Sequence, residues 1–266
     1  MDDRAAGTVR VGLAGALGRM GKAVAAVLQG RDEAEVVAAF DRPETTGETA
    51  GALTLATREA AVPLCDVVID FSTSAASAEL ATAAAAAGRP ALVIGSTGWS
   101  EAEEAALRAA AHRVPIVRAG NYSLGVNVLA GLVEQAARRL PADAWDIEVF
   151  EAHHRRKVDA PSGTALMLGE AVARGRQVML AEREIRARDG ITGPRPEGAI
   201  GFSVMRGGGL VGEHQVVFAG DDEVLTFSHS ARDRSLFARG AIVAALWIVR
   251  QPPGLYDMMD VLGFRS

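Results

Sequence analysis

A glycine-spaced turn near the start of the chain is the feature that most restricts its fold. Gly15, Gly18 and Gly21 form the pattern GxxGxxG directly after the apolar run VRVGLAG (9–15) and before a helical stretch. Glycines allow a tight turn from strand to helix, and they let the backbone approach a pyrophosphate at the helix N-terminus. Leu17 stands where the standard fingerprint has its middle glycine, so we expect the closest approach at Gly18.

An acidic and a basic residue follow the next apolar run, which spans 35–40. A carboxylate at Asp41 can hold the ribose hydroxyls of NAD, whereas Arg42 can receive the 2′-phosphate of NADP. We therefore expect NADH, NADPH or both as the cofactor, with Arg19 as a further cationic partner. The alternatives are a plain turn that binds nothing and a solvated acid–base pair.

Short apolar runs alternate with helical stretches through the first half of the chain. The pattern predicts strands over 9–15, 35–40, 65–72, 90–97 and 114–120, and helices over about 19–29, 75–87 and 100–112. Continuous apolar strands separated by helices favour a doubly wound α/β fold, a parallel sheet covered on both faces. The turns at Ser72-Thr73, Gly95–Gly98 and Gly120–Ser123 follow strand ends and should line one crevice.

The pattern changes after about residue 124. We expect a helix over 124–139, a strand over 145–154, a helix over 163–175, three strand-like runs within 199–231 and a last helix over about 234–249. Consecutive strands without helices between them indicate a second domain of α+β type with a mixed sheet. The predicted domains are 1–123 with 234–266 for the cofactor, and 124–233 for the substrate and for assembly.

The segment EAHHRRKVDAPSGTAL (151–166) carries the densest chemistry. Its imidazoles and Lys157 are candidate proton donors near neutral pH. Pro161 to Thr164 resemble a helix start that offers backbone N–H groups to an anion, so a carboxylate or phosphate substrate is expected. His153 and His154 are adjacent and face opposite ways on a strand, so no metal is expected. A solvated charged loop is the alternative.

Composition excludes several classes of protein. The 266 residues carry 28 basic and 33 acidic side chains, a net charge of −5 that argues against nucleic-acid and membrane-surface partners. A single cysteine, Cys65, rules out an intramolecular disulfide. No signal peptide or long apolar span is evident, so a cytoplasmic protein is expected. Cys65 and the methionines are expected in the core, and His214 and His229 are expected to be structural.

Six motifs, in order along nearly the whole chain, resemble the dihydrodipicolinate reductase (4-hydroxy-tetrahydrodipicolinate reductase) family. They are GALGRMG (15–21), VVIDFS (67–72), VIGSTGW (94–99), NYSLGVNV (121–128), EAHHRRKVDAPSGTAL (151–166) and IGFSVMRGGGLVGEH (200–214). The resemblance implies a Rossmann-like cofactor domain, a substrate domain with a mixed sheet and a homotetramer. It also implies NAD(P)H-dependent reduction of a small cyclic dicarboxylate in diaminopimelate and lysine biosynthesis.

The resemblance also implies roles for individual residues. His153 matches the proposed proton donor or acceptor, and Lys157 the general acid; which of them delivers the proton stays open. Substrate carboxylates would lie at His154, Ser162, Gly163 and Thr164. The positions implied around the nicotinamide cofactor are Gly15, Ala16, Leu17, Gly18, Arg19, Met20, Asp41, Arg42, Gly95, Ser96, Thr97, Ala119, Gly120, Asn121 and Tyr122.

The chain departs from the family pattern at Thr73 and in the turn at Gly120–Tyr122. Thr73 stands where many relatives carry an arginine, which removes one candidate phosphate contact, and Gly120-Asn121-Tyr122 replaces Ala-Asn-Phe. Two other functions stay open on the same scaffold. One is a different NAD(P)-linked imine or carbonyl reductase, and the other is a non-catalytic dinucleotide sensor.

Overall fold

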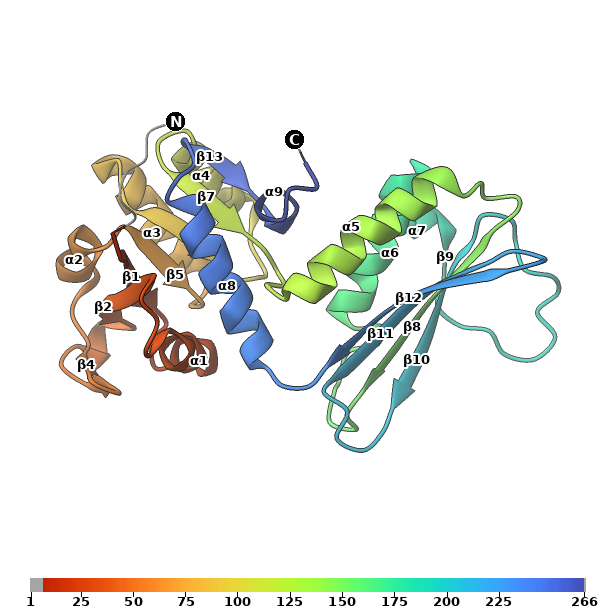
Figure 1. Cartoon of the computed structure of the whole chain (residues 1–266), viewed down its shortest axis with the longest axis horizontal. Helices are drawn as coiled ribbons and strands as arrows, with labels where there is room; N and C mark the ends of the chain where they lie inside the picture. Colours follow the sequence, from red (N-terminus) through yellow and green to blue (C-terminus); the bar gives the residue numbers. More distant parts are fainter. Residues whose placement is uncertain (1–6, 266) are drawn as a thin grey trace. The chain divides into compact units, whose positions relative to one another are not determined.

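The computed structural model describes residues 7–265 and forms two compact units. Of the described residues, unit 1 comprises 7–124 together with 235–265, and unit 2 is Gly125–Arg234. The C-terminal segment, blue in Figure 1, therefore belongs with the N-terminal strands, which are red and orange. No helix within residues 7–265 is long and apolar enough to cross a bilayer.

Unit 1 is built on a six-stranded parallel sheet in the order β13-β7-β6-β5-β1-β2. The strands are β1 (Val9–Ala14), β2 (Ala34–Phe40), β5 (Val67–Asp70), β6 (Ala91–Ile94), β7 (Pro115–Arg118) and β13 (Gly254–Tyr256). The order reverses at β1, because β2 lies on one side of it and β5 on the other. The predicted doubly wound parallel sheet is confirmed.

Helices cover both faces of this sheet, which explains why its strands are apolar throughout. Val67 and Ile69 pack in one core cluster with residues of α1 (Arg19–Leu28) and α8 (Ser235–Ile248). Val68, between them, packs in a second cluster with residues of α3 (Ser74–Ala87) and α4 (Glu101–Ala111). Successive side chains of a strand point to opposite faces, so both faces of β5 are buried. The last helix packs on the first sheet, as predicted.

Several short elements of unit 1 have no counterpart in the sequence predictions. They are η1 (Pro43–Thr45), β3 (Thr49–Ala50), β4 (Leu53–Thr54), α2 (Arg58–Ala61), η2 (Val62–Leu64), β13 and α9 (Met258–Val261). Segments of two to four residues are too short for a hydrophobic period to reveal.

Unit 2 contains a five-stranded mixed sheet in the order β12-β11-β8-β10-β9. Its strands are β8 (Asp146–His153), β9 (Glu184–Ile185), β10 (Ile200–Arg206), β11 (Gly212–Ala219) and β12 (Val224–Ala231). β10 runs parallel to β8 and β9, while β11 runs antiparallel to β8 and β12. The predicted α+β unit with a mixed sheet is confirmed.

The helices of unit 2 are α5 (Leu124–Arg139), which begins at the unit boundary, α6 (Gly163–Arg176) and the short α7 (Leu180–Arg183). α6 packs against β8, β10 and β11. Cys65 is buried as expected, but the expectation for the methionines is wrong at Met179 and Met205, which are 65% and 49% exposed. Met205 lies on a strand of unit 2 and Met179 caps α7, so neither is enclosed within its unit.

Candidate functional site

The glycine turn joins β1 to α1 with very little space around its backbone. Gly15 has φ +71°, and a Cβ there would lie 2.9 Å from the carbonyl oxygen of Phe71. A Cβ on Gly21 would lie 2.4 Å from the carbonyl oxygen of Gly15. Gly18 is the N-cap of α1, and no side chain caps this helix start. The local geometry thus leaves the helix N-terminus open to an anion.

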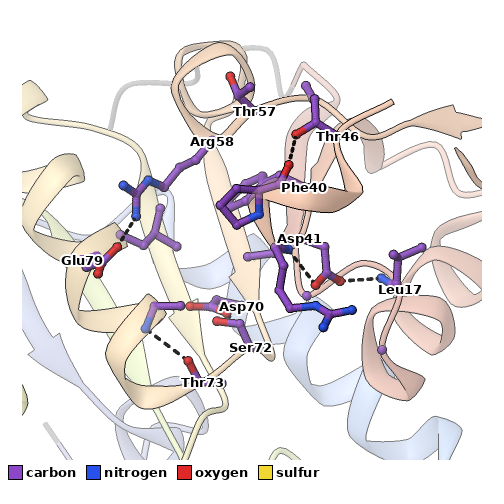
Figure 2. Close-up of a pocket in the computed structure, with 18 of the residues that line it drawn as sticks. Leu17, Phe40, Asp41, Thr46, Thr57, Arg58, Asp70, Ser72, Thr73 and Glu79 are labelled. Atoms are coloured by element: carbon purple, nitrogen blue, oxygen red, sulfur yellow. Dashed lines mark hydrogen bonds and ion pairs between the residues drawn. The ribbon is translucent and has the colours of Figure 1, made fainter. Parts of the chain in front are cut away.

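A cavity of about 680 Å³ lies beside this turn, at the carboxyl ends of β1, β2 and β5 (Figure 2). Parallel α/β sheets bind ligands outside the carboxyl ends of their strands, where the strand order reverses. The volume is within the range of small-molecule and cofactor sites. The residues that line it are Ala14, Gly15, Leu17, Gly18, Phe40, Asp41, Arg42, Pro43, Thr46, Ala56, Thr57, Arg58, Glu59, Asp70, Phe71, Ser72, Thr73, Ala76, Glu79 and Leu80.

Asp41 ties the second strand to the glycine turn. One of its carboxylate oxygens accepts the backbone N–H of Leu17 at 2.9 Å, and the other accepts that of Arg42 at 2.9 Å. A carboxylate has about four lone-pair sites, so each oxygen keeps capacity for a further donor. Arg42 has a largely exposed side chain whose contact with Glu44 is 3.5 Å long, which leaves the guanidinium free to bind a ligand.

The turn after β5 lines the cavity and is held by a buried acid, Asp70. The Asp70 carboxylate accepts the backbone N–H of Ser72 at 2.8 Å and the hydroxyl of Ser77 at 2.6 Å. The Ser77 hydroxyl also meets that of Ser96, after β6, at 2.8 Å. Burial raises the pKa of Asp70, and the hydrogen bonds from the two serines act in the opposite direction. Ser72 and Thr73 line the cavity, as expected from their place at a strand end.

The structure gathers only part of the predicted cofactor set at this cavity. Gly15, Leu17, Gly18, Asp41 and Arg42 line it. The remaining residues of the predicted cofactor set do not line it; they are Ala16, Arg19, Met20, Gly95, Ser96, Thr97, Ala119, Gly120, Asn121 and Tyr122.

Three of these residues have other surroundings. Ala16 and Met20 pack with the apolar core of unit 1. The side chain of Tyr122 is buried, and its hydroxyl donates to the carbonyl oxygens of Ile94 and Val117 at 2.8 and 3.2 Å. The ring and hydroxyl of Tyr122 are therefore used inside unit 1 and do not line the cavity.

The second chemistry-bearing segment lies at the end of β8 and the start of α6, within unit 2. Ser162 is the N-cap of α6, and its hydroxyl accepts the backbone N–H of Ala165 at 3.2 Å. Gly163 and Thr164 form the first turn of α6, as the sequence predicts. No acidic side chain belongs to this first turn, although the Glu151 carboxylate accepts the backbone N–H of the N-cap residue, Ser162.

His153 is buried at the end of β8 and contacts a buried acid. Its Nδ1 lies 2.6 Å from a carboxylate oxygen of Glu151. Burial acts to raise the pKa of Glu151, but hydrogen bonds from Arg206, His153 and the Ser162 backbone hold it below its ordinary value. The imidazole of His214 meets that of His153 edge-on, with ring centroids 5.1 Å apart. Burial, followed by His153, lowers the pKa of His214 to about 4.

Lys157 and His154 lie on the turn that follows β8. The Lys157 ammonium pairs with Asp159 at 2.8 Å, and the backbone N–H of Lys157 donates to the carbonyl of His154. The Nδ1 of His154 is buried and has no hydrogen-bond partner among the described residues. Within residues 7–265, no three histidine, cysteine or carboxylate side chains gather closely enough to hold a metal ion.

Comparison with known proteins assigns both halves of the chain. The family model "Dihydrodipicolinate reductase, N-terminus" matches residues 9–122, and "Dihydrodipicolinate reductase, C-terminus" matches residues 125–262. The chain belongs to the dihydrodipicolinate reductase family. Two relatives named 4-hydroxy-tetrahydrodipicolinate reductase support this. The Caulobacter vibrioides protein is 62% identical over 97% of this chain and 98% of its own, and that of Rhizobium rhizogenes is 51% identical over 95% and 96%.

A solved structure of a dihydrodipicolinate reductase has the same fold. The dipicolinate-bound enzyme from Paenisporosarcina sp. TG-14 superposes with a TM-score of 0.78 at 22% identity, covering 95% of this chain and 98% of that one. At this identity the likeness concerns the fold alone.

Sequence reasoning missed several polar residues of this dihydrodipicolinate reductase family member. Arg58 and Glu79, which pair at 3.1 Å, line the cavity of unit 1 but belong to no motif. Arg206 pairs with Glu151 at 2.6 Å across 55 residues of chain. Arg206 lies in the motif IGFSVMRGGGLVGEH (200–214), but no role was predicted for it there.

Proposed function

We propose that this protein is a 4-hydroxy-tetrahydrodipicolinate reductase, which reduces 4-hydroxy-tetrahydrodipicolinate to tetrahydrodipicolinate with NADH or NADPH, in diaminopimelate and lysine biosynthesis. The observation that carries the proposal is the match over 97% of the chain to a reductase of that name. Both chemistry-bearing segments are present, the glycine turn with its cavity and the His153–Thr164 segment.

The cavity of unit 1 fits a dinucleotide. A Cβ on Gly15 or Gly21 would meet backbone, so the turn can be made only with glycine, and the open start of α1 favours a pyrophosphate. We assign Asp41 to the ribose hydroxyls and Arg42 to a 2′-phosphate, so that both NADH and NADPH are accepted. When bound, the reduced nicotinamide supplies the hydride.

We assign the substrate's carboxylates to the start of α6 and to His154. Ser162 caps the helix, and Gly163 and Thr164 bring its first backbone N–H groups together. A carboxylate there is favoured by the helix dipole and by charge-assisted hydrogen bonds. The buried Nδ1 of His154, without a partner in the described chain, gains one from such a ligand. The related enzyme from Paenisporosarcina binds dipicolinate, a dicarboxylate of this kind.

The 4-hydroxyl leaves as water to give a conjugated imine, hydride addition at C4 gives an enamine, and uptake of one proton gives tetrahydrodipicolinate. We assign this proton to Lys157 or to His153. The Lys157 side chain is one-fifth exposed, and among the described residues its ion-pair partner is the exposed Asp159. His153 is held by Glu151, which leaves Nε2 as its free nitrogen.

We further propose that the protein works in the cytoplasm as a homotetramer assembled through the sheet of unit 2. Met205 and Val224 project from the face opposite Glu151, whose carboxylate meets α6. They are 49% and 64% exposed in the single chain, and exposed apolar side chains of this kind are typical of a surface that binds another subunit. Light scattering should give four times the chain mass, and Val224→Glu should lower it, whereas a monomeric wild type contradicts the assembly.

The reaction is tested by following reduced-nicotinamide absorbance with substrate made in situ from pyruvate and aspartate semialdehyde by a synthase. NADH and NADPH are run side by side, and the control omits the synthase. Synthase-dependent decay supports the reductase. Absence of decay, from protein that binds a reduced nicotinamide, overturns it in favour of a non-catalytic dinucleotide sensor.

A further inference from the structure

A fully buried carboxylate organises the end of β8. The side chain of Glu151 is inaccessible to solvent, yet it accepts four hydrogen bonds. One oxygen accepts the backbone N–H of Ser162 at 2.9 Å and Nη2 of Arg206 at 2.6 Å. The other accepts Nη1 of Arg206 at 2.7 Å and meets His153 Nδ1 at 2.6 Å. A buried charge is tolerated only when paired and hydrogen-bonded, and here every lone pair is used.

Arg206 keeps this carboxylate ionised. β10 runs parallel to β8 and places Arg206 directly beside His153 in the register. The guanidinium, which stays charged in proteins, grips both oxygens of Glu151 with its two terminal nitrogens. It also donates to the carbonyl oxygen of Asp159, so its own position is fixed from a second direction.

An ionised carboxylate can only accept hydrogen bonds, and this decides which nitrogen of His153 carries hydrogen. Nδ1 must be the donor to Glu151, so in the neutral imidazole Nε2 holds the free lone pair. Gly212 leaves room on that side, because a Cβ there would lie 3.2 Å from Nε2. Nε2 of His153 therefore faces a position without a side chain.

The same carboxylate holds the start of α6. It accepts a hydrogen bond from the backbone N–H of Ser162, the N-cap residue. The hydroxyl of Ser162 in turn accepts the backbone N–H of Ala165. One buried group thus sets both the orientation of His153 and the place where α6 begins. We propose that Glu151, clamped by Arg206, is a positioning residue that holds His153 as the Nδ1–H tautomer and joins it to the substrate-binding end of α6. The inference rests on the proposed function for the reaction it serves.

The first test reads the tautomer directly, without turnover. Long-range ¹H–¹⁵N correlation distinguishes imidazoles protonated at Nδ1 from those protonated at Nε2, and the chain has five histidines. His153→Gln identifies the signal to be followed. The wild type should show the Nδ1–H form at His153, and Glu151→Gln, whose amide can donate to Nδ1, should convert it to the Nε2–H form or a mixture. An Nε2–H form in the wild type overturns the proposal.

The second test separates positioning from folding. Glu151→Gln should lower kcat by about 10- to 100-fold, the usual cost of losing a residue that orients a functional imidazole, while KM for the nicotinamide cofactor changes less than about twofold. Glu148→Gln is the matched control, since Glu148 lies on the same strand and binds Arg188, Arg195 and Ser203 instead. It should leave both the His153 signal and kcat near wild type.

A third variant covers the case in which Glu151→Gln fails to fold. Arg206→Lys keeps the positive charge but loses the bidentate hydrogen bonds to Glu151, so the variant should retain the fold. It should broaden the His153 signal and lower kcat less than Glu151→Gln does. Unchanged tautomer and unchanged kcat in either folded variant contradict the proposal. A wild type that shows the Nδ1–H form but no reduction contradicts the reductase assignment alone.

Discussion

The carbonyl oxygen of Gly15 occupies the space that a side chain on Gly21 would need, with only 2.4 Å to a Cβ placed there. Gly21→Ala should therefore push α1 away from the turn, at a cost of about 1–3 kcal/mol for overpacking. Affinity for NADH should fall at least tenfold, because the open start of α1 moves. Titration of NADH fluorescence measures this. Lys22→Ala, exposed on the same helix, is the control, and equal affinities in both variants would refute the assignment of this turn.

Arg42 should decide how well NADPH is used. Arg42 lines the cavity, and its largely exposed guanidinium has a 3.5 Å contact with Glu44, so we expect it to bind a 2′-phosphate. Arg42→Ala should reduce kcat/KM for NADPH about tenfold or more, the value of one charge-assisted hydrogen bond, and for NADH less than about twofold. Steady-state kinetics with both nucleotides decide the matter. Arg108→Ala, on α4 and outside the cavity lining, should change neither; equal losses with the two nucleotides would sink the assignment.

Lys157 should matter for turnover and little for cofactor binding. Lys157→Ala removes a candidate proton donor, and general acid catalysis contributes about 10²- to 10⁴-fold to rate. We expect kcat to fall by at least about 100-fold with KM for NADH nearly unchanged. The neighbouring exposed Arg156→Ala tests whether charge alone explains the effect. A parallel loss of turnover and cofactor affinity would show that Lys157 is only structural.

His214 should make the protein less stable in mild acid. Burial, then His153, lowers the pKa of His214 to about 4 from 6.5, so between these values the unfolded chain binds a proton that the folded chain does not. Stability therefore falls as pH drops through this window, by roughly 3 kcal/mol in all. His214→Asn should remove this part of the loss.

Urea unfolding at pH 7 and at pH 4.5 measures the difference between wild type and variant. His112→Asn is the control, since His112 is an exposed C-cap of α4. An equal acid-induced loss in wild type and His214→Asn would contradict the burial argument.

The sequence predicted those parts of the fold that repeat a pattern over enough residues. β5 and β6 are apolar at every position but Asp70 because both of their faces are covered, and α6 begins where a serine and a glycine indicate a cap. β9 and β13 have two and three residues and owe their place to the neighbouring strand, so no local pattern reveals them.

The candidate site was predictable where its residues are close in sequence. The glycine turn and the His153–Thr164 segment are each continuous, and their spacing carries the information. Arg206 meets Glu151 only because β10 pairs with β8 in one register, a relation formed 55 residues apart. Tyr122 shows a different limit. The sequence places it near a strand end, but it does not reveal that the Tyr122 hydroxyl forms a hydrogen bond inside the core.

The return of α8 to the first sheet has a consequence for biosynthesis on the ribosome. One of the two core clusters of unit 1 contains Ala238, Ala241, Ile242 and Ile248 of that helix, all encoded after the whole of unit 2. At about 5–20 residues per second, the nascent N-terminal strands wait on the order of 10 s for the segment that covers them. During that interval α1 is already made but α8 is not, so the apolar surface that α8 later covers lacks its partner.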